Sequence, residues 1–158
     1  MTPHGAAGLA PLPDVFRVEP TTEAIANARR RVLTVASTWD IAHPDALADL
    51  GLCAIELVGH SHYEIGAGCS ARLSVNGPRF RLEVIDAGMT LPTAPHPGTG
   101  LFVVAHVAAA WGAEPHAHGR VLWFEVDLEQ ADQSKRLAAR IRAALPTVRR
   151  GRLAAVRP

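Results

Sequence analysis

The sequence predicts a two-layer α/β sandwich, in which helices cover one face of a small sheet. The first sign is the order of the predicted elements, which follow one another as β-α-α-β-β-α-β-α along 158 residues. The second is composition, because 48% of the residues are apolar and a chain of this length favours one domain with one core. No apolar run is long enough for a membrane-spanning helix and the N-terminus lacks a signal-peptide pattern, so we expect a cytoplasmic protein without a membrane partner.

The N-terminal part is predicted to contain a leader, a strand and a helix. Residues 1–13 are rich in proline, glycine and alanine without periodicity, which is typical of a flexible leader. Residues 14–19 alternate well enough for a short strand, which a proline ends. Either Thr21 or Thr22 can cap the first helix, which we expect to continue to about Thr38.

A second helix and a hairpin are predicted next. The helix begins at Pro44 and ends before Gly66, and its apolar stripe is formed by Leu47, Leu50, Ala54, Leu57 and Val58. Residues 71–76 and 79–85 both alternate between apolar and polar side chains. The turn between them has the sequence Asn-Gly-Pro, so the two strands are predicted to form a hairpin.

The C-terminal part is predicted to contain a loop, two helices and a strand. Residues 86–98 are rich in proline and glycine and are predicted to be a loop. Residues 101–110 are apolar nearly all round, which indicates a buried helix, and residues 120–127 are typical of a strand. An added amphipathic helix is predicted at 129–145, followed by a basic tail to the end of the chain.

Charge is unevenly distributed along the chain. Residues 1–128 carry eight arginines and thirteen acids, whereas residues 129–158 carry seven arginines, one lysine and two acids. The helix in the basic segment needs a surface to pack against, which is either the acidic body of its own chain or a partner, including a second subunit in a homodimer. The basic segment has no aromatic residue, so nucleic acid is not an expected partner.

The cysteines and histidines do not follow a metal-site pattern. Cys53 and Cys69 lie sixteen residues apart without a CxxC motif, and we expect buried free thiols. His116 and His118 flank one alanine and could chelate one ion, but a third ligand is not evident. We therefore assign no metal-binding residue.

Two polar features stand out against this background. Glu56 lies on the second predicted helix, opposite the apolar stripe, and His60 and Tyr63 follow on the same face, which could also simply meet solvent. Asp86 and Gly88 directly follow a predicted strand, a pattern that ordinary turns share.

A third feature is a glycine pair at the start of the buried helix. It is formed by Gly98, Thr99, Gly100 and Leu101. Glycines at a helix N-terminus let backbone N–H groups approach a phosphate, and the helix dipole favours negative charge there. A Gly-x-Gly pattern alone is a weak signal, since this is neither a dinucleotide fingerprint nor a P-loop.

The order of these features is more specific than any one of them. A helix with a glutamate is followed by a hairpin, Asp-x-Gly at a strand end, a loop, Gly-x-Gly-Leu before a helix, and a closing strand. In this order the chain resembles the anti-sigma-factor serine kinases, which belong to the gyrase and histidine-kinase ATPase superfamily. The resemblance covers about residues 14–128 and implies the histidine-kinase-like ATPase (Bergerat) fold, with a small mixed sheet and helices on one face.

The resemblance also implies roles for individual residues. Glu56 matches the residue that acts as a base or polarises the attacking hydroxyl. Asp86 matches the carboxylate that accepts a hydrogen bond from the adenine amino group, and Gly88 matches the glycine that makes room for the ring. The residues that match the phosphate side of an ATP site are Gly98, Thr99, Gly100 and Leu101.

His60 departs from the family pattern. It stands where the family has an asparagine that binds Mg²⁺ through oxygen, and imidazole is a poor ligand for this hard ion. The segment between Met89 and Pro97 has no lysine or arginine to reach a γ-phosphate. Phosphoryl transfer depends on a metal and positioned cations, so we expect reduced ATP affinity and doubtful Mg²⁺ binding.

Two functions follow from the resemblance. The first is a regulatory protein of the ATP-binding type that binds a sigma factor or an anti-sigma antagonist, with weakened or lost kinase activity. The alternative is an active protein-serine kinase that uses Mg-ATP to phosphorylate an anti-sigma antagonist, with His60 tolerated. The sequence leaves open whether the chain is an enzyme.

Overall fold

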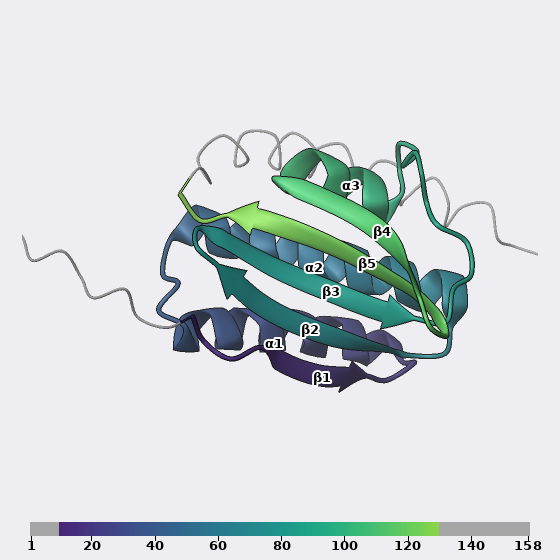
Figure 1. The fold of residues 1–158 in the computed structure, drawn as a ribbon, viewed down its shortest axis with the longest axis horizontal. Coiled ribbons are helices and arrows are strands. Elements are labelled where there is room, and N and C mark those ends of the chain that lie inside the picture. Colours follow the sequence, from purple (N-terminus) through teal and green to yellow (C-terminus); the bar gives the residue numbers. More distant parts are fainter. Residues whose placement is uncertain (1–9, 130–158) are drawn as a thin grey trace, which may run out of the picture.

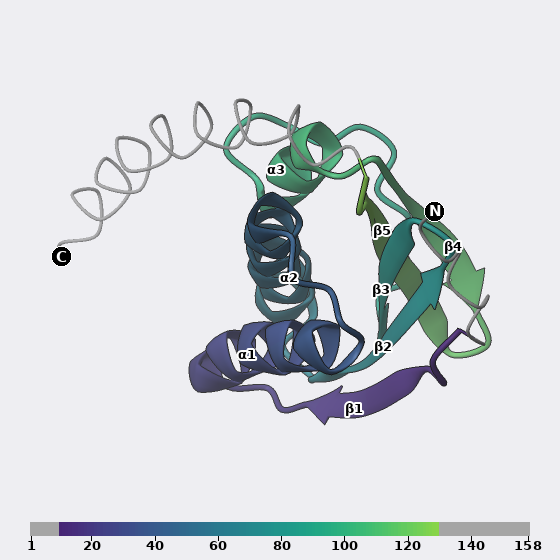
Figure 2. The same cartoon turned by 90° about the vertical axis from the view of Figure 1, so that its left-hand side faces the viewer.

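The structure, a computed structural model, describes residues 10–129. Their elements are β1 (Asp14–Val18), α1 (Thr22–Thr38), α2 (Pro44–Ile65), β2 (Cys69–Asn76), β3 (Arg79–Asp86), α3 (Gly100–Val107), β4 (Ala110–His116) and β5 (Gly119–Asp127). The helices cover one face of a five-stranded sheet, so the predicted two-layer architecture is confirmed (Figures 1 and 2). The predicted leader up to residue 9, and the added helix and basic tail from residue 130, lie outside the described residues.

The sheet has the strand order β1-β2-β3-β5-β4, and every neighbouring pair is antiparallel. The prediction of a mixed sheet was therefore wrong. The chain passes from β3 through α3 to β4, but β5 turns back and pairs between β3 and β4. Because β5 separates these two strands, no parallel pair forms in the described sheet (Figure 1).

Strand β4 was missed by the sequence analysis, which extended the preceding helix to residue 110. The helix α3 ends at Val107, and β4 contains Gly112 and Pro115, two residue types that disfavour strands. Proline is tolerated because β4 lies at an edge of the sheet. Gly112 pairs with Trp123, and a Cβ atom on this glycine would lie 2.7 Å from the indole ring, so the missing side chain makes room for the tryptophan.

The ends of the first two helices follow the local signals in the sequence. The Thr21 hydroxyl accepts a hydrogen bond from the N–H of Ala24 at 3.3 Å, which caps α1. Pro44 occupies the first turn of α2, and Gly66 ends this helix in the left-handed conformation, with φ of 70°. Neither α2 nor any other helix within residues 10–129 has the length and apolar character needed to cross a bilayer.

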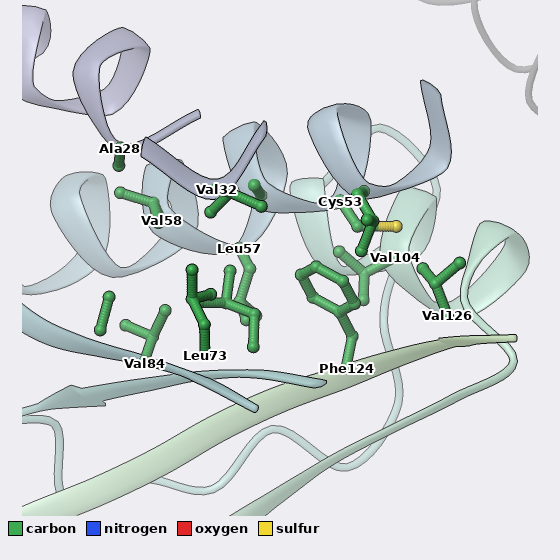
Figure 3. Packing of buried hydrophobic residues seen from close by; sticks show 14 of the residues in the cluster. Ala28, Val32, Cys53, Leu57, Val58, Leu73, Val84, Val104, Phe124 and Val126 are labelled. Carbon is green, nitrogen blue, oxygen red and sulfur yellow. The ribbon is translucent and has the colours of Figure 1, made fainter. Parts of the chain in front are cut away.

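The core lies between the helix layer and the inner face of the sheet. Val32 from α1 and Leu57 from α2 point toward the sheet, where Leu73, Val84 and Phe124 meet them (Figure 3). Full burial of one such large apolar side chain contributes about 1.5–3 kcal/mol to stability. The two cysteines belong to this core as buried free thiols, as the sequence predicted.

Candidate functional site

The candidate site lies where β3 ends and β5 begins, beneath the C-terminal half of α2. Asp86 is the last residue of β3 and pairs in register with Arg120, the second residue of β5. Leu122 and Phe124 follow Arg120 on the inner face of β5, so strand alternation turns the arginine toward the helices. The exposed fraction is 1% for the Arg120 side chain and 0% for that of Asp86.

The Arg120 guanidinium is held by two carboxylates and one carbonyl group. Its Nε donates to Asp86 Oδ1 at 2.9 Å and its Nη2 to Asp86 Oδ2 at 3.2 Å, which makes a bidentate pair. Nη1 donates to the carbonyl oxygen of Thr90 at 2.6 Å and to Glu64 Oε1 at 3.3 Å, and Nη2 lies 3.3 Å from Glu64 Oε2. A buried charge is tolerated only when it is paired and hydrogen-bonded, and Arg120 meets that condition.

The acceptor edge of Asp86 is therefore already engaged. Its Oδ1 also accepts a hydrogen bond from the N–H of Gly88 at 2.8 Å. A Cβ atom on Gly88 would lie 2.5 Å from Arg120 Nε and 2.7 Å from its Cζ. The guanidinium thus occupies the space beside Gly88 that the resemblance assigns to a nucleobase.

Gly119 allows Arg120 to reach this position. A Cβ atom at Gly119 would overlap the carbonyl oxygen of Asp86, so the start of β5 can approach the end of β3 only if the residue there is glycine. The close approach fixes the register that places Arg120 opposite Asp86. The buried ion pair therefore depends on the backbone at Gly119 as well as on the two charged side chains.

His60 and Glu64 form the side of the cluster that α2 supplies. They lie one turn apart, with His60 Nε2 2.6 Å from Glu64 Oε2, although the two groups are not aligned as a hydrogen bond. Burial lowers the pKa of His60, and nearby Arg120 also lowers it, while Glu64 and Asp86 act in the opposite direction. A neutral His60 leaves one arginine facing two carboxylates, so the cluster has an excess of negative charge.

The glycine pair before α3 lies against the middle of α2. A Cβ atom on Gly100 would lie 2.8 Å from the carbonyl oxygen of Glu56 and 3.0 Å from its Oε2. The Thr99 hydroxyl caps α3 by accepting from the N–H of Phe102 at 3.3 Å, and Leu101 is buried in the core. The structure therefore brings Glu56 to the glycine pair.

The two halves of the predicted site are joined through α2. Glu56 meets the N-terminus of α3, where Gly98 adopts φ of 86°. The next two turns of α2 bring His60 beside Glu64, and Glu64 to Arg120, the partner of Asp86. Tyr63 does not join them, because its side chain is 74% exposed.

Sequence reasoning missed Arg120 and Glu64. The signal for Arg120 was its position on the apolar face of an alternating strand, together with Leu122, Phe124 and Val126. A charge on such a face indicates a buried ion pair. The signal for Glu64 was weaker, since it lies one helical turn after His60 on a polar face.

The residues present do not fit ATP and Mg²⁺ in the manner that the resemblance implies. With Arg120 in place, the space beside Gly88 does not accommodate a purine ring, and Asp86 already accepts hydrogen bonds from Arg120 and Gly88. His60 offers nitrogen where a hard ion prefers oxygen. Among residues 10–129, no three histidine, cysteine, aspartate or glutamate side chains converge as a metal site.

No protein-family model matches the chain, and no curated protein matches it at a significant level. The family resemblance therefore stays a prediction from sequence order, and function has to be argued from the site itself.

Proposed function

We propose that this chain is a regulatory protein-binding domain that acts without a bound nucleotide. In this proposal it resembles anti-sigma factors, binds a sigma factor or an anti-sigma antagonist, and has lost kinase activity. The observation that carries the proposal is the Arg120 guanidinium, which lies between Gly88 and Asp86 where a nucleobase would have to bind.

The chemistry of the two groups explains why one can replace the other. The adenine amino group would donate a hydrogen bond to Asp86, and the planar guanidinium offers donors of the same kind with a positive charge. Displacing Arg120 would break a buried ion pair, which costs about 3–5 kcal/mol. At about 1.4 kcal/mol for each factor of ten, a nucleotide would bind about 10²–10⁴-fold more weakly than to an open pocket.

Two further features argue against phosphoryl transfer. His60 presents ring nitrogen and no oxygen to a metal ion, whereas Mg²⁺ prefers oxygen ligands. The segment between Met89 and Pro97 contains no lysine or arginine. Binding to another protein needs neither a metal nor a cation at this position.

An active protein kinase is the second candidate, and one contact favours it. Glu56 lies against Gly100, so a carboxylate is kept beside the glycine pair at the start of α3. For this candidate to hold, Arg120 would have to leave Asp86 when Mg-ATP binds.

A thermal-shift titration of the full chain with ATP, with and without Mg²⁺, tests the proposal. We expect an unchanged melting temperature at millimolar nucleotide, because Arg120 competes for Asp86. A ligand that fills a site at a hundredfold excess over its Kd would stabilise the fold by about 2.7 kcal/mol. A rise of several degrees that requires both ATP and Mg²⁺ would refute the proposal and favour the kinase.

A further inference from the structure

A groove of about 460 Å³ lies between α1 and β1, which is an edge strand of the sheet formed by the described residues. It is lined by Phe16, Arg17, Val18, Glu19, Thr21, Ala24, Asn27, Ala28 and Arg31. β1 is an edge strand of the sheet, and α1 lies beside it at the same margin of the molecule (Figure 2). Phe16, Arg17 and Val18 are consecutive residues of β1 and face opposite sides of the sheet in turn, so a lining that includes all three indicates a groove at the margin of the strand.

The groove has an apolar floor and a polar rim. Helix α1 contributes Ala24, Asn27, Ala28 and Arg31, whose spacing of three and four residues places them on one face. The alanines and the buried Val18 provide apolar surface, whereas Asn27 and Arg31 are exposed. Binding sites commonly combine such surface with a few polar groups that fix orientation.

We propose that this groove binds an extended acidic segment of a partner protein, which pairs with the free edge of β1 as an added strand. Edge strands present unpaired backbone N–H and C=O groups, and added strands use them for affinity while side-chain pockets provide specificity. Pro13 and Pro20 bracket β1, so the pairing is limited to about the five residues of this strand.

The acidic character of the occupant rests on Arg17, because Arg31, the other arginine of the groove, is already paired with Asp14. Arg31 donates to Asp14 at 2.7 and 3.0 Å and lies over the Phe16 ring, which fixes its position on the helix wall. Arg17 on the strand wall makes a 3.8 Å ion pair with Glu19, and both side chains are more than half exposed. Such a pair contributes about 0–1 kcal/mol, so Arg17 can turn to a carboxylate of a ligand at little cost.

The wider charge distribution agrees with this assignment. Residues 14–38 hold four arginines and three acids, a net charge of +1, whereas the rest of residues 1–129 hold four arginines and eleven acids, a net charge of −7. An acidic segment is therefore attracted to the margin formed by β1 and α1 and repelled by the remaining body.

The terminal segments of this chain do not have the required chemistry. Residues 1–9 contain no acid, and residues 130–158 contain one acid and eight basic residues. The proposed occupant is therefore a segment of a partner protein rather than residues 1–9 or 130–158. The inference rests on the proposed function in assigning a protein partner, but it does not depend on Arg120.

A synthetic peptide of alternating glutamate and valine, labelled with fluorescein, serves as the probe. We expect saturable binding to the full chain in fluorescence anisotropy, with NMR shifts of the amides of Arg17 and Val18. A matched peptide with lysine in place of glutamate should not bind. Reversing the charge with Arg17→Glu should weaken binding of the acidic peptide about tenfold and allow the lysine peptide to bind.

A substitution that fills the groove provides a second test of peptide binding. Asn27→Trp places a large side chain in the groove from an exposed position of α1 and should abolish binding, whereas Thr34→Trp is the matched control at an exposed position of α1 that does not line the groove. Absence of saturable binding, or equal binding to both variants, would overturn the inference. So would a concentration-dependent dimer that Asn27→Trp dissociates, because the groove would then hold a second copy.

The peptide-binding and ATP experiments distinguish failure of the groove assignment from failure of the proposed function. If the peptide does not bind and ATP with Mg²⁺ leaves the melting temperature unchanged, the groove assignment is wrong and the proposed function stands. If the peptide binds as expected and ATP with Mg²⁺ stabilises the fold, the groove assignment stands and the nucleotide-free function is wrong.

Discussion

Removing the Arg120 side chain should destabilise the protein far more than removing an arginine from the surface. Arg120→Ala deletes a bidentate pair with Asp86, the contacts with Glu64 and a hydrogen bond to Thr90, and it leaves the Asp86 carboxylate buried. Loss of one partner from a buried pair costs about 3–5 kcal/mol, mainly because the remaining charge has no counterion.

Arg79→Ala is the matched control, because this arginine also ion-pairs with carboxylates but at longer range. Its Nη1 lies 3.7 Å from Glu125 Oε2 and its Nε 3.7 Å from Asp127 Oδ2, with a side chain that is 39% exposed. We expect a cost of about 0–1 kcal/mol for this variant. Urea denaturation with equal m-values gives both free energies of unfolding on one scale.

The double variant Arg120→Ala/Asp86→Ala distinguishes two costs in stability: the loss of the ion pair, and the burial of an unpaired Asp86 carboxylate. It should be more stable than Arg120→Ala alone, because replacing both partners removes the unpaired carboxylate. Low millimolar guanidinium should raise the melting temperature of Arg120→Ala, where it can take the place of the missing group, but not that of the double variant. If Arg120→Ala costs no more than Arg79→Ala, the description of a structural buried pair is wrong.

Three further predictions concern other parts of the structure. Burial lowers the pKa of His60 relative to the unfolded chain, so the unfolded state takes up a proton first and the free energy of unfolding should decrease as pH drops below about 6.5. In urea denaturation at a series of pH values, His60→Gln should reduce this decrease, whereas a similar change at the exposed His118 should not. Burial also raises the pKa of Cys53 and Cys69, so both thiols should react with Ellman's reagent at the rate of unfolding, and immediate reaction in native buffer would contradict their burial. Gly119→Ala should destabilise the fold strongly because its Cβ would overlap the Asp86 carbonyl oxygen, whereas Gly77→Ala, in open space at the β2–β3 turn, should show only the cost of its positive φ of 57°.

Local signals in the sequence were sufficient for the elements that depend on neighbouring residues. The N-cap at Thr21 and Pro44 in the first turn of α2 marked the starts of the two long helices, and the Asn-Gly-Pro turn marked the β2–β3 hairpin. Strand β4 was not predictable in this way. Its glycine and proline lower strand propensity, and its pairing places Gly112 against the Trp123 ring, a contact that exists only in the folded sheet.

The same distinction applies to the candidate site. Asp86, Gly88, Glu56 and Gly100 were found because their order along the chain is specific. Arg120 was missed because its partners are remote: Asp86 is 34 residues away and Glu64 is 56 residues away. Gly88 illustrates the consequence. The resemblance explains this glycine by a nucleobase, but the Arg120 guanidinium beside it is enough to explain why a side chain is absent there.

The ion pairs of Arg81 and Arg17 indicate where a negatively charged ligand would bind most favourably. On the outer face of the sheet, Arg81 contacts Glu83 and Glu125 at 3.1 Å, and its guanidinium lies 4.0 Å from the centre of the Trp123 ring. A carboxylate that approached this face would have to release existing ion pairs before forming its own. Arg17 carries a longer and more exposed pair, so added acidic peptide should shift the side-chain NMR signals of Arg17 at concentrations that leave Arg81 unchanged. The opposite order would place the attractive surface on the sheet and remove the electrostatic reason for assigning the partner to the groove beside β1.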